Sequence, residues 1–163
     1  MGLQLPGELA DLLNELGYTW PKADETKMFE LAQMWFGFAD QVAPLPAQAH
    51  AAGQSVLAQN NGPATDAFAK LWTANSAAVP VLDNAVTGAQ AIGAALIVCA
   101  AVVLALKISV IVQLTILLIQ IIQAIATAAP TFGASLLEIP VFKKLADIAI
   151  DYLVGQALEA LLG

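Results

Sequence analysis

The chain has 163 residues, of which 59% are apolar and 12% charged, and its formal net charge is -7. Ordinary soluble domains hold about 25% charged residues, so this chain is strongly apolar, and that composition excludes intrinsic disorder. All six of its basic residues are lysines. So few positive charges exclude the phosphate-neutralising surface that nucleic-acid binding requires. The length predicts a single domain over residues 1–163.

A short amphipathic helix is predicted over residues 7–16, because its four leucines recur on one side. Gly17 stands at the position where such a helix ends. The next residues, Tyr18–Pro21, interrupt the period. Asp24 is then placed to accept a hydrogen bond from the free N–H groups that begin a second helix.

The second helical stretch carries apolar side chains at alternating steps of three and four from Met28 to Val56, the spacing of a heptad seam. Pro44 and Pro46 fall inside it and predict a bend, because a proline removes a backbone donor and crowds the preceding turn. The seam residues expected to pack in the hairpin or to meet a partner are Leu31, Trp35, Phe38 and Val42.

A strong turn signal ends this stretch, combining residues that tolerate positive φ with a proline suited to the first helical position. It consists of Asn60, Asn61, Gly62 and Pro63. A second seam follows from Ala64 to Leu96. Two seams joined by a short turn predict an antiparallel helical hairpin over residues 21–90. After the turn, the expected packing and partner residues are Phe68, Leu71 and Trp72.

The third stretch, residues 108–129, holds no charge and is long enough to span a hydrocarbon core of about 30 Å. A polar stripe nevertheless runs along it, formed by Ser109, Gln113, Gln120, Gln123 and Thr127. Two interpretations stay open: the stripe faces solvent or another helix in a bundle, or it lines a watery path between copies in lipid. An unbroken helix over residues 85–129 would measure about 65 Å, too long for a simple span, which favours the bundle.

A final amphipathic helix is predicted after Pro140, returning against the long one. Its expected apolar face consists of Val141, Leu145, Ile148 and Tyr152. The predicted fold class is therefore all-α: an antiparallel helical hairpin extended by a long apolar helix and a closing amphipathic helix, together forming a helical bundle. Its segments are residues 1–20 (helix and loop), 21–90 (hairpin) and 91–163 (the two later helices).

Patterns for catalysis or metal binding are missing from the sequence. His50 is the sole histidine and Cys99 the sole cysteine, so neither a histidine cluster nor a cysteine-based zinc site can form. No Gly-x-Ser-x-Gly sequence and no phosphate-cradling glycine loop occurs. We therefore expect no catalytic residue, cofactor, metal or enzymatic activity. The first residues also lack the apolar core of a secretory signal peptide.

The opening of the chain and the stretch after the turn are similar to a known family. The opening residues that carry the similarity are Leu5, Pro6, Leu9, Gly17, Tyr18, Trp20, Pro21 and Asp24. Gly62–Phe68 and Trp72 match the stretch that follows the turn. The sequence resembles the WXG100-like N-terminal domains of actinobacterial polymorphic toxins over nearly its whole length. Such proteins carry Trp-x-Gly at the hairpin turn, whereas Trp35-Phe36-Gly37 lies in the middle of the first seam here.

The resemblance implies an all-helical module recognised by a type VII (ESX-type) secretion system, at the head of a secreted effector that continues into a toxin in longer members. It implies a helical WXG100-type partner or self-association. The chain has no Tyr-x-x-x-Asp or Tyr-x-x-x-Glu export signal, so we expect a partner chain to supply one. The expected location is outside the cell or in its envelope, reached without a signal peptide.

Two functions from different classes remain open at this stage. The preferred one is a non-enzymatic module for secretion targeting and protein interaction. The alternative is a membrane-inserting pore that delivers or exports a toxin, with lipid contact through residues 91–129. The polar stripe supports this alternative, as does the outer-membrane channel formed by one mycobacterial member of the family.

Overall fold

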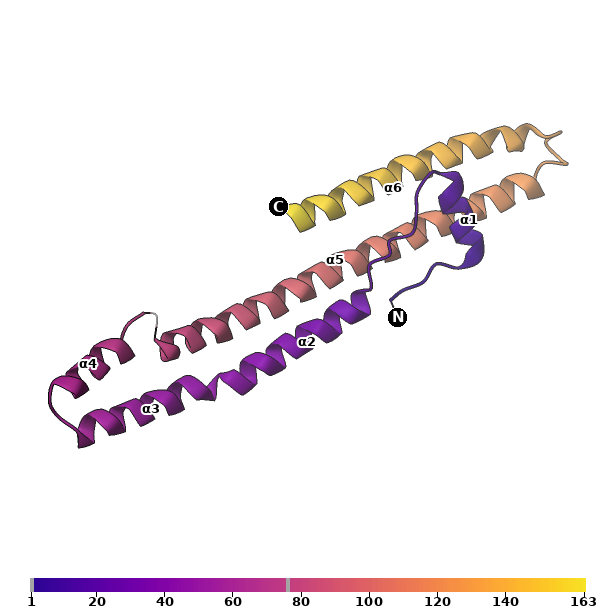
Figure 1. The fold of residues 1–163 in the computed structure, drawn as a ribbon. Helices are drawn as coiled ribbons and strands as arrows, with labels where there is room; N and C mark the ends of the chain where they lie inside the picture. The colour runs from indigo at the N-terminus through magenta and orange to yellow at the C-terminus, as the bar shows by residue number, and fades with distance from the viewer. Residues whose placement is uncertain (1, 76) are drawn as a thin grey trace. The chain divides into compact units, whose positions relative to one another are not determined.

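A computed structural model describes residues 2–75 and 77–163, and it confirms the all-α fold class, since no strand occurs among those residues (Figure 1). The elements are α1 (Gly7–Glu15), α2 (Glu25–Val42), α3 (Pro44–Gln59), α4 (Pro63–Trp72), α5 (Ala78–Ala126), the short 3-10 helix η1 (Ala134–Glu138) and α6 (Ile139–Leu162). They form two compact units. Unit 1 holds the chain up to Lys27 together with Val98–Gly163, and unit 2 holds Met28–Ile97. A single domain over residues 1–163 stays a prediction.

Unit 2 is a helical hairpin in which the buried row on α2 and α3 consists of small or compact residues. Ala32, Ala39, Pro46 and Gly53 are buried and recur every seven residues. The heptad period was predicted correctly, but half of the seam lies one position away from the predicted one. Leu31 and Phe38, expected in the seam, are 46% and 47% exposed. Because α2 is apolar on a wide face, its small side chains can lie inside while the large ones stay outside.

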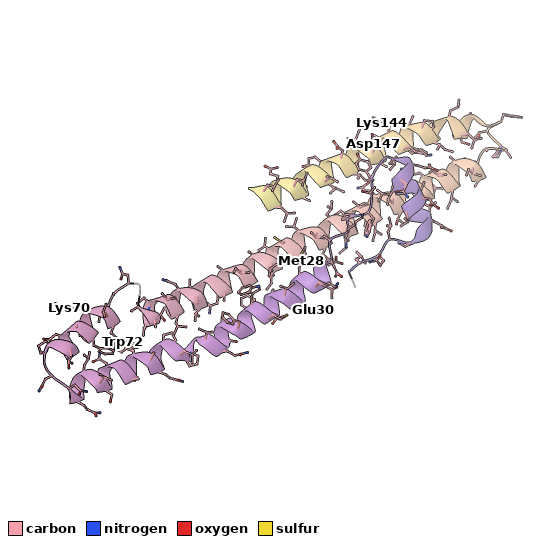
Figure 2. All side chains as sticks on the ribbon, viewed as in Figure 1. Met28, Glu30, Lys70, Trp72, Lys144 and Asp147 are labelled. Carbon is pink, nitrogen blue, oxygen red and sulfur yellow. The ribbon has the colours of Figure 1, made fainter. Side chains whose placement is uncertain are left out.

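Aromatic rings packed on glycines hold this hairpin together. A Cβ built on Gly53 would lie 2.3 Å from Nε1 of Trp72, so the indole rests directly on the α3 backbone, and Figure 2 labels this side chain on α4. The Phe68 ring stacks on the same indole, with ring centroids 5.3 Å apart. In the same unit, Phe36 rests on Gly93 of α5 in the same way. Glycine is required at these two positions because the aromatic ring leaves no space for a Cβ, and not because of the backbone conformation.

The helices of unit 2 are interrupted at two places. As predicted from the prolines, α2 ends at Val42 and α3 begins at Pro44. The second seam was predicted to run without a break from Ala64 to Leu96, and this prediction was wrong. Helix α4 ends at Trp72, and α5 begins only at Ala78.

Unit 1 has a core built by three helices. Leu9 and Leu13 of α1 pack with Val110 and Leu114 of α5 and with Ile150 of α6. The closing helix therefore returns along α5, as predicted. Figure 1 shows the two helices running in opposite directions within this unit.

The face through which α6 packs differs from the predicted one. All four residues of the expected apolar face are exposed: Val141, Leu145, Ile148 and Tyr152. Ala146 and Ile150 are buried in their place, and Val154 packs on the core. Because apolar residues surround much of α6, periodicity alone could not select the inner face.

The packing at Gly53 predicts an unusual response to substitution. Replacing an exposed helical glycine by alanine stabilises a helix by about 0.5–1 kcal/mol. Gly88→Ala should do so, since a Cβ there meets nothing within 4 Å. Gly53→Ala should instead lower the free energy of unfolding by roughly 1–3 kcal/mol, because the methyl group overlaps the indole. Urea titration followed by circular dichroism measures both, and equal effects of the two substitutions would contradict the packing.

Candidate functional site

The residues of the family-like opening hold unit 1 together. Leu5 and Leu9 pack in or against its core. Gly17 ends α1 with a φ of 87°, a conformation that glycine adopts without strain. Asp24 accepts a hydrogen bond from the Lys27 N–H at 3.2 Å and so caps α2, as predicted. Pro6 immediately precedes α1 as its N-cap residue.

Tyr18 connects the opening to the closing helix. Its hydroxyl donates to a carboxylate oxygen of Asp147 at 3.0 Å, and Lys144 binds the other oxygen at 2.6 Å. Lys144 and Asp147 lie close together on α6 (Figure 2). The hydrogen bonds from Lys144 and Tyr18 lower the pKa of Asp147. Burial and the hydrogen bond to Asp147 raise the pKa of Tyr18. The tyrosine thus packs within the unit.

A buried ion pair lies beside the opening. Nζ of Lys107, the only charged group between Asn84 and Leu137, lies 2.7 Å from a carboxylate oxygen of Glu25. The same ammonium donates to the Ala23 carbonyl at 2.7 Å and lies 5.7 Å from the centroid of the Trp20 ring. Both charged side chains are almost completely shielded from solvent. A buried charge needs such partners to avoid a large desolvation penalty.

The N-terminal segment closes over this pair. The Leu3 N–H donates to Glu25, and the Leu3 carbonyl accepts a hydrogen bond from Trp20 Nε1 at 3.2 Å. Burial alone would raise the pKa of Glu25, but the hydrogen bonds from Leu3 and Lys107 outweigh it and lower the pKa to about 2. Glu25 therefore stays ionised down to strongly acidic pH. The sequence carries no signal for this pair, because its two members are far apart in the chain.

The polar stripe on α5 is divided between two environments. Ser109 lines one hollow with residues of α6, and Gln113 and Gln120 line another. Gln123 and Thr127 are exposed. Within unit 1, most of the stripe therefore faces the space beside α6, which is the arrangement of an inter-helix stripe.

Unit 2 carries an exposed apolar row on α2 that continues onto α3. Leu31, Met34 and Phe38 are exposed, as is Leu45 of α3. Trp35 is half-buried and meets Phe38 edge to face, with ring centroids 6.1 Å apart. A shallow hollow of about 370 Å³ lies among Leu31, Met34, Trp35 and Phe38. We call the exposed row Leu31, Met34, Phe38 and Leu45 the outer stripe.

The other predicted hairpin residues lie as follows. Asn60 to Pro63 form the turn between α3 and α4, with Gly62 at a φ of 108°. Val42, Phe68 and Trp72 are half-buried. Leu71 is exposed rather than packed. Its helix, α4, is short and meets its neighbour through the adjacent Trp72.

The long helix α5 leaves many apolar side chains exposed. Its most apolar window of 18 residues has a mean hydropathy of 2.8, yet only 22% of that window is buried. By length and composition this helix could cross a membrane. Its outward side chains include Ile108, Val112, Ile116, Ile119 and Ile122. Extended exposed apolar surfaces are frequent at protein and membrane contact sites.

Among residues 2–75 and 77–163, no group of three His, Cys, Asp or Glu side chains is arranged to hold a metal ion. The exposed His50 ring lies 3.4 Å from the side-chain amide of Gln54.

Comparison with known proteins identifies the family. The model of the WXG100-like domain matches residues 4–146. The chain belongs to the WXG100-like family, and this places it among helical proteins related to type VII secretion. Domains of this family typically associate with helical partners or with themselves. No curated protein and no solved structure matches the chain.

The lowered pKa of Glu25 predicts how acid affects stability. Its pKa falls from 4.5 to about 2 on folding, so the ion pair stabilises the fold fully above about pH 4.5 and loses that effect as the pH falls toward 2. Glu25→Gln should lower the free energy of unfolding at pH 7 by roughly 3–5 kcal/mol, because it leaves Lys107 without a counterion. In this variant, the free energy of unfolding should also decline much less between pH 4.5 and 2 than in the unmodified chain.

Urea titrations at several pH values measure this difference. Glu15→Gln provides the control, because Glu15 forms an exposed ion pair with Lys143 at 2.5 Å. An exposed pair contributes at most about 1 kcal/mol. If the two variants showed the same pH profile, the assignment of the acid response to Glu25 would be wrong.

Proposed function

We propose that the chain is a non-enzymatic targeting and interaction module of a protein secreted by a type VII system, and that it acts at the head of a polymorphic toxin. The proposal rests on the family match over residues 4–146. It places the working surface on the outer stripe of α2 and α3, where a helical partner would bind. Export would follow from the partner's recognition by the secretion machinery, and the protein would reach the envelope or the medium by that route.

The outer stripe is the observation that carries the partner assignment. Its members at positions 31, 34, 38 and 45 follow heptad spacing and are all exposed. A partner helix with the same spacing can insert side chains between them along its length, as in a coiled coil. The hollow around Trp35 and Phe38 suits one large apolar side chain at the centre of that contact. The buried row beside it is already occupied within the hairpin.

Removing two members of the outer stripe should block partner binding and export. The double variant Leu31→Ser, Phe38→Ser removes most of the apolar area while leaving Ala32 and Ala39 in place. We expect at least about tenfold less protein in the medium of an actinobacterial host with a functional type VII system, since each buried apolar side chain contributes about 1.5–3 kcal/mol. Immunoblotting of medium and cell fractions measures export.

Val81→Ser is the matched control, because Val81 is 53% exposed on α5, outside the stripe. A host strain without the secretion system provides the baseline. Circular dichroism checks that each variant remains helical. Unchanged export of a folded double variant would contradict the partner assignment, and equal amounts in the two host strains would contradict the targeting function itself.

A membrane pore is the second candidate, because one observation favours it. Only 22% of the most apolar window of α5 is buried, so the helix could exchange its water-facing surface for lipid. Against this, Ser109, Gln113 and Gln120 border hollows shared with α6. They could line a watery path only after α6 had moved away.

Dye release separates the two candidates. The targeting module is expected to release no more carboxyfluorescein from phosphatidylcholine vesicles than buffer does. A pore would empty the vesicles, and Gln113→Leu with Gln120→Leu would reduce that release because it removes the polar lining. Release by the unmodified chain would replace the targeting module with the pore as the leading function.

A further inference from the structure

The turn between α3 and α4 carries an exposed asparagine that is followed by a glycine. Asn61 and Gly62 lie between the end of α3 and the start of α4 (Figure 1), and both are exposed. An asparagine side chain is chemically labile, because the backbone nitrogen of the next residue can attack its carbonyl carbon. How fast that attack proceeds depends on how the fold holds the two groups.

Neither reacting group is restrained by an internal hydrogen bond. Within the described ranges 2–75 and 77–163, no hydrogen bond involves the Gly62 N–H or the side-chain amide of Asn61. The neighbouring Asn60 differs, since its amide donates to the Val56 carbonyl at 2.8 Å. The attack requires rotation of the backbone that brings the Gly62 nitrogen toward the Asn61 side chain. That rotation breaks no hydrogen bond within the protein and therefore meets little resistance.

The backbone conformation at Gly62 requires a residue without a Cβ. Its φ of 108° lies in a region that residues with a side chain rarely adopt. The chain therefore needs glycine here to turn from α3 into α4. The same lack of a Cβ leaves the Gly62 nitrogen accessible to the side chain of Asn61. The shape of the turn and the lability of its asparagine thus have one cause.

The other asparagines lack this combination. Asn14 lies in α1 and Asn84 in α5, where hydrogen bonds along the helix hold the nitrogen that follows. A residue with a Cβ follows each of them, and one also follows Asn60 and Asn75. Such a side chain crowds the attacking nitrogen. Asn61 is the one asparagine in the sequence that a glycine follows.

We propose that Asn61 is a site of spontaneous deamidation, at which the turn converts with time into a mixture of isoaspartate and aspartate. The Gly62 nitrogen loses its proton to solvent hydroxide and forms a bond to Cγ of Asn61. The bond from Cγ to Nδ2 breaks, and the amide leaves as ammonia after taking a proton from water. Water then opens the five-membered imide. Cleavage at the main-chain carbonyl gives isoaspartate, cleavage at Cγ gives aspartate, and no electron transfer is involved.

The products place a negative charge immediately before α4. A carboxylate near the start of a helix is favourable, because the first N–H groups of the helix have no partner within it. Isoaspartate also adds one carbon atom to the backbone between residues 61 and 62. The site is independent of the outer stripe, whose members lie on α2 and near the start of α3. The modified fraction increases with the age of the protein.

Peptide mapping by mass spectrometry, after the purified chain has been kept in mildly alkaline buffer, tests the proposal. We expect the folded chain to convert Asn61 at a rate within about threefold of that in guanidinium chloride, because the fold restrains neither group. The rate should rise about tenfold with each pH unit, since the attacking nitrogen must first lose its proton. Heavy-oxygen water should label the product, because water opens the imide. Asn61→Gln should abolish the conversion, since glutamine would have to form a larger ring.

Ala85→Gly is the matched control, because it places a glycine after Asn84, an exposed asparagine inside α5. Hydrogen bonds along the helix should slow conversion of Asn84 at least about tenfold in the folded variant relative to the unfolded one. Circular dichroism checks that the variant remains helical. Three results would overturn the proposal: protection of Asn61 by the fold as strong as that of Asn84, faster conversion at Asn60 than at Asn61, or a product without the oxygen label.

Discussion

The buried pair of Lys107 and Glu25 fixes the orientation of α5. Lys107 lies in the same inward row as Val103, Val110 and Leu114, and its ammonium can be buried only where Glu25 and the Ala23 carbonyl meet it. On a helix apolar nearly all round, packing alone would tolerate several rotations about the axis. The buried charge of Lys107 allows only one of these rotations. Once that rotation is set, Ile108 and Val112 must point outward and Gln113 toward α6.

The sequence predicted the helices well because its apolar residues recur with a clear period, and it predicted the turn because Asn60–Pro63 is a local signal. The sequence did not predict which face of each helix is buried. On α2 the larger Leu31 and Phe38 were expected in the seam, but Ala32 and Ala39 occupy it. The size of an apolar side chain did not predict its burial, because these helices are apolar on more than one side. Glu25 could not be found as the partner of Lys107, since its position depends on how the chain folds back, not on any local pattern.

The family-like opening illustrates how a recognisable motif can serve structure. Tyr18 bonds Asp147, and Trp20 lies under Lys107 and bonds the Leu3 carbonyl. These aromatic residues use their polar atoms inside unit 1. The surfaces left for recognition are instead the outer stripe and the outward side of α5, neither of which includes residues of the opening. The residues of the opening and the exposed apolar surfaces therefore lie in different parts of the chain.

The indole of Trp72 gives the end of the hairpin a distinct dynamic character. Its buried Nε1 has no hydrogen-bond acceptor among residues 2–75 and 77–163, and a buried donor left unpaired costs about 1–3 kcal/mol. Opening α4 would return that N–H to water and recover this energy. The indole contacts Gly53 through van der Waals packing. We therefore expect α4 and the neighbouring part of α3 to exchange their amide hydrogens before the rest of unit 2. Local breathing at this end would let the hairpin adjust there to a bound helix without loosening the row of alanines farther along α2.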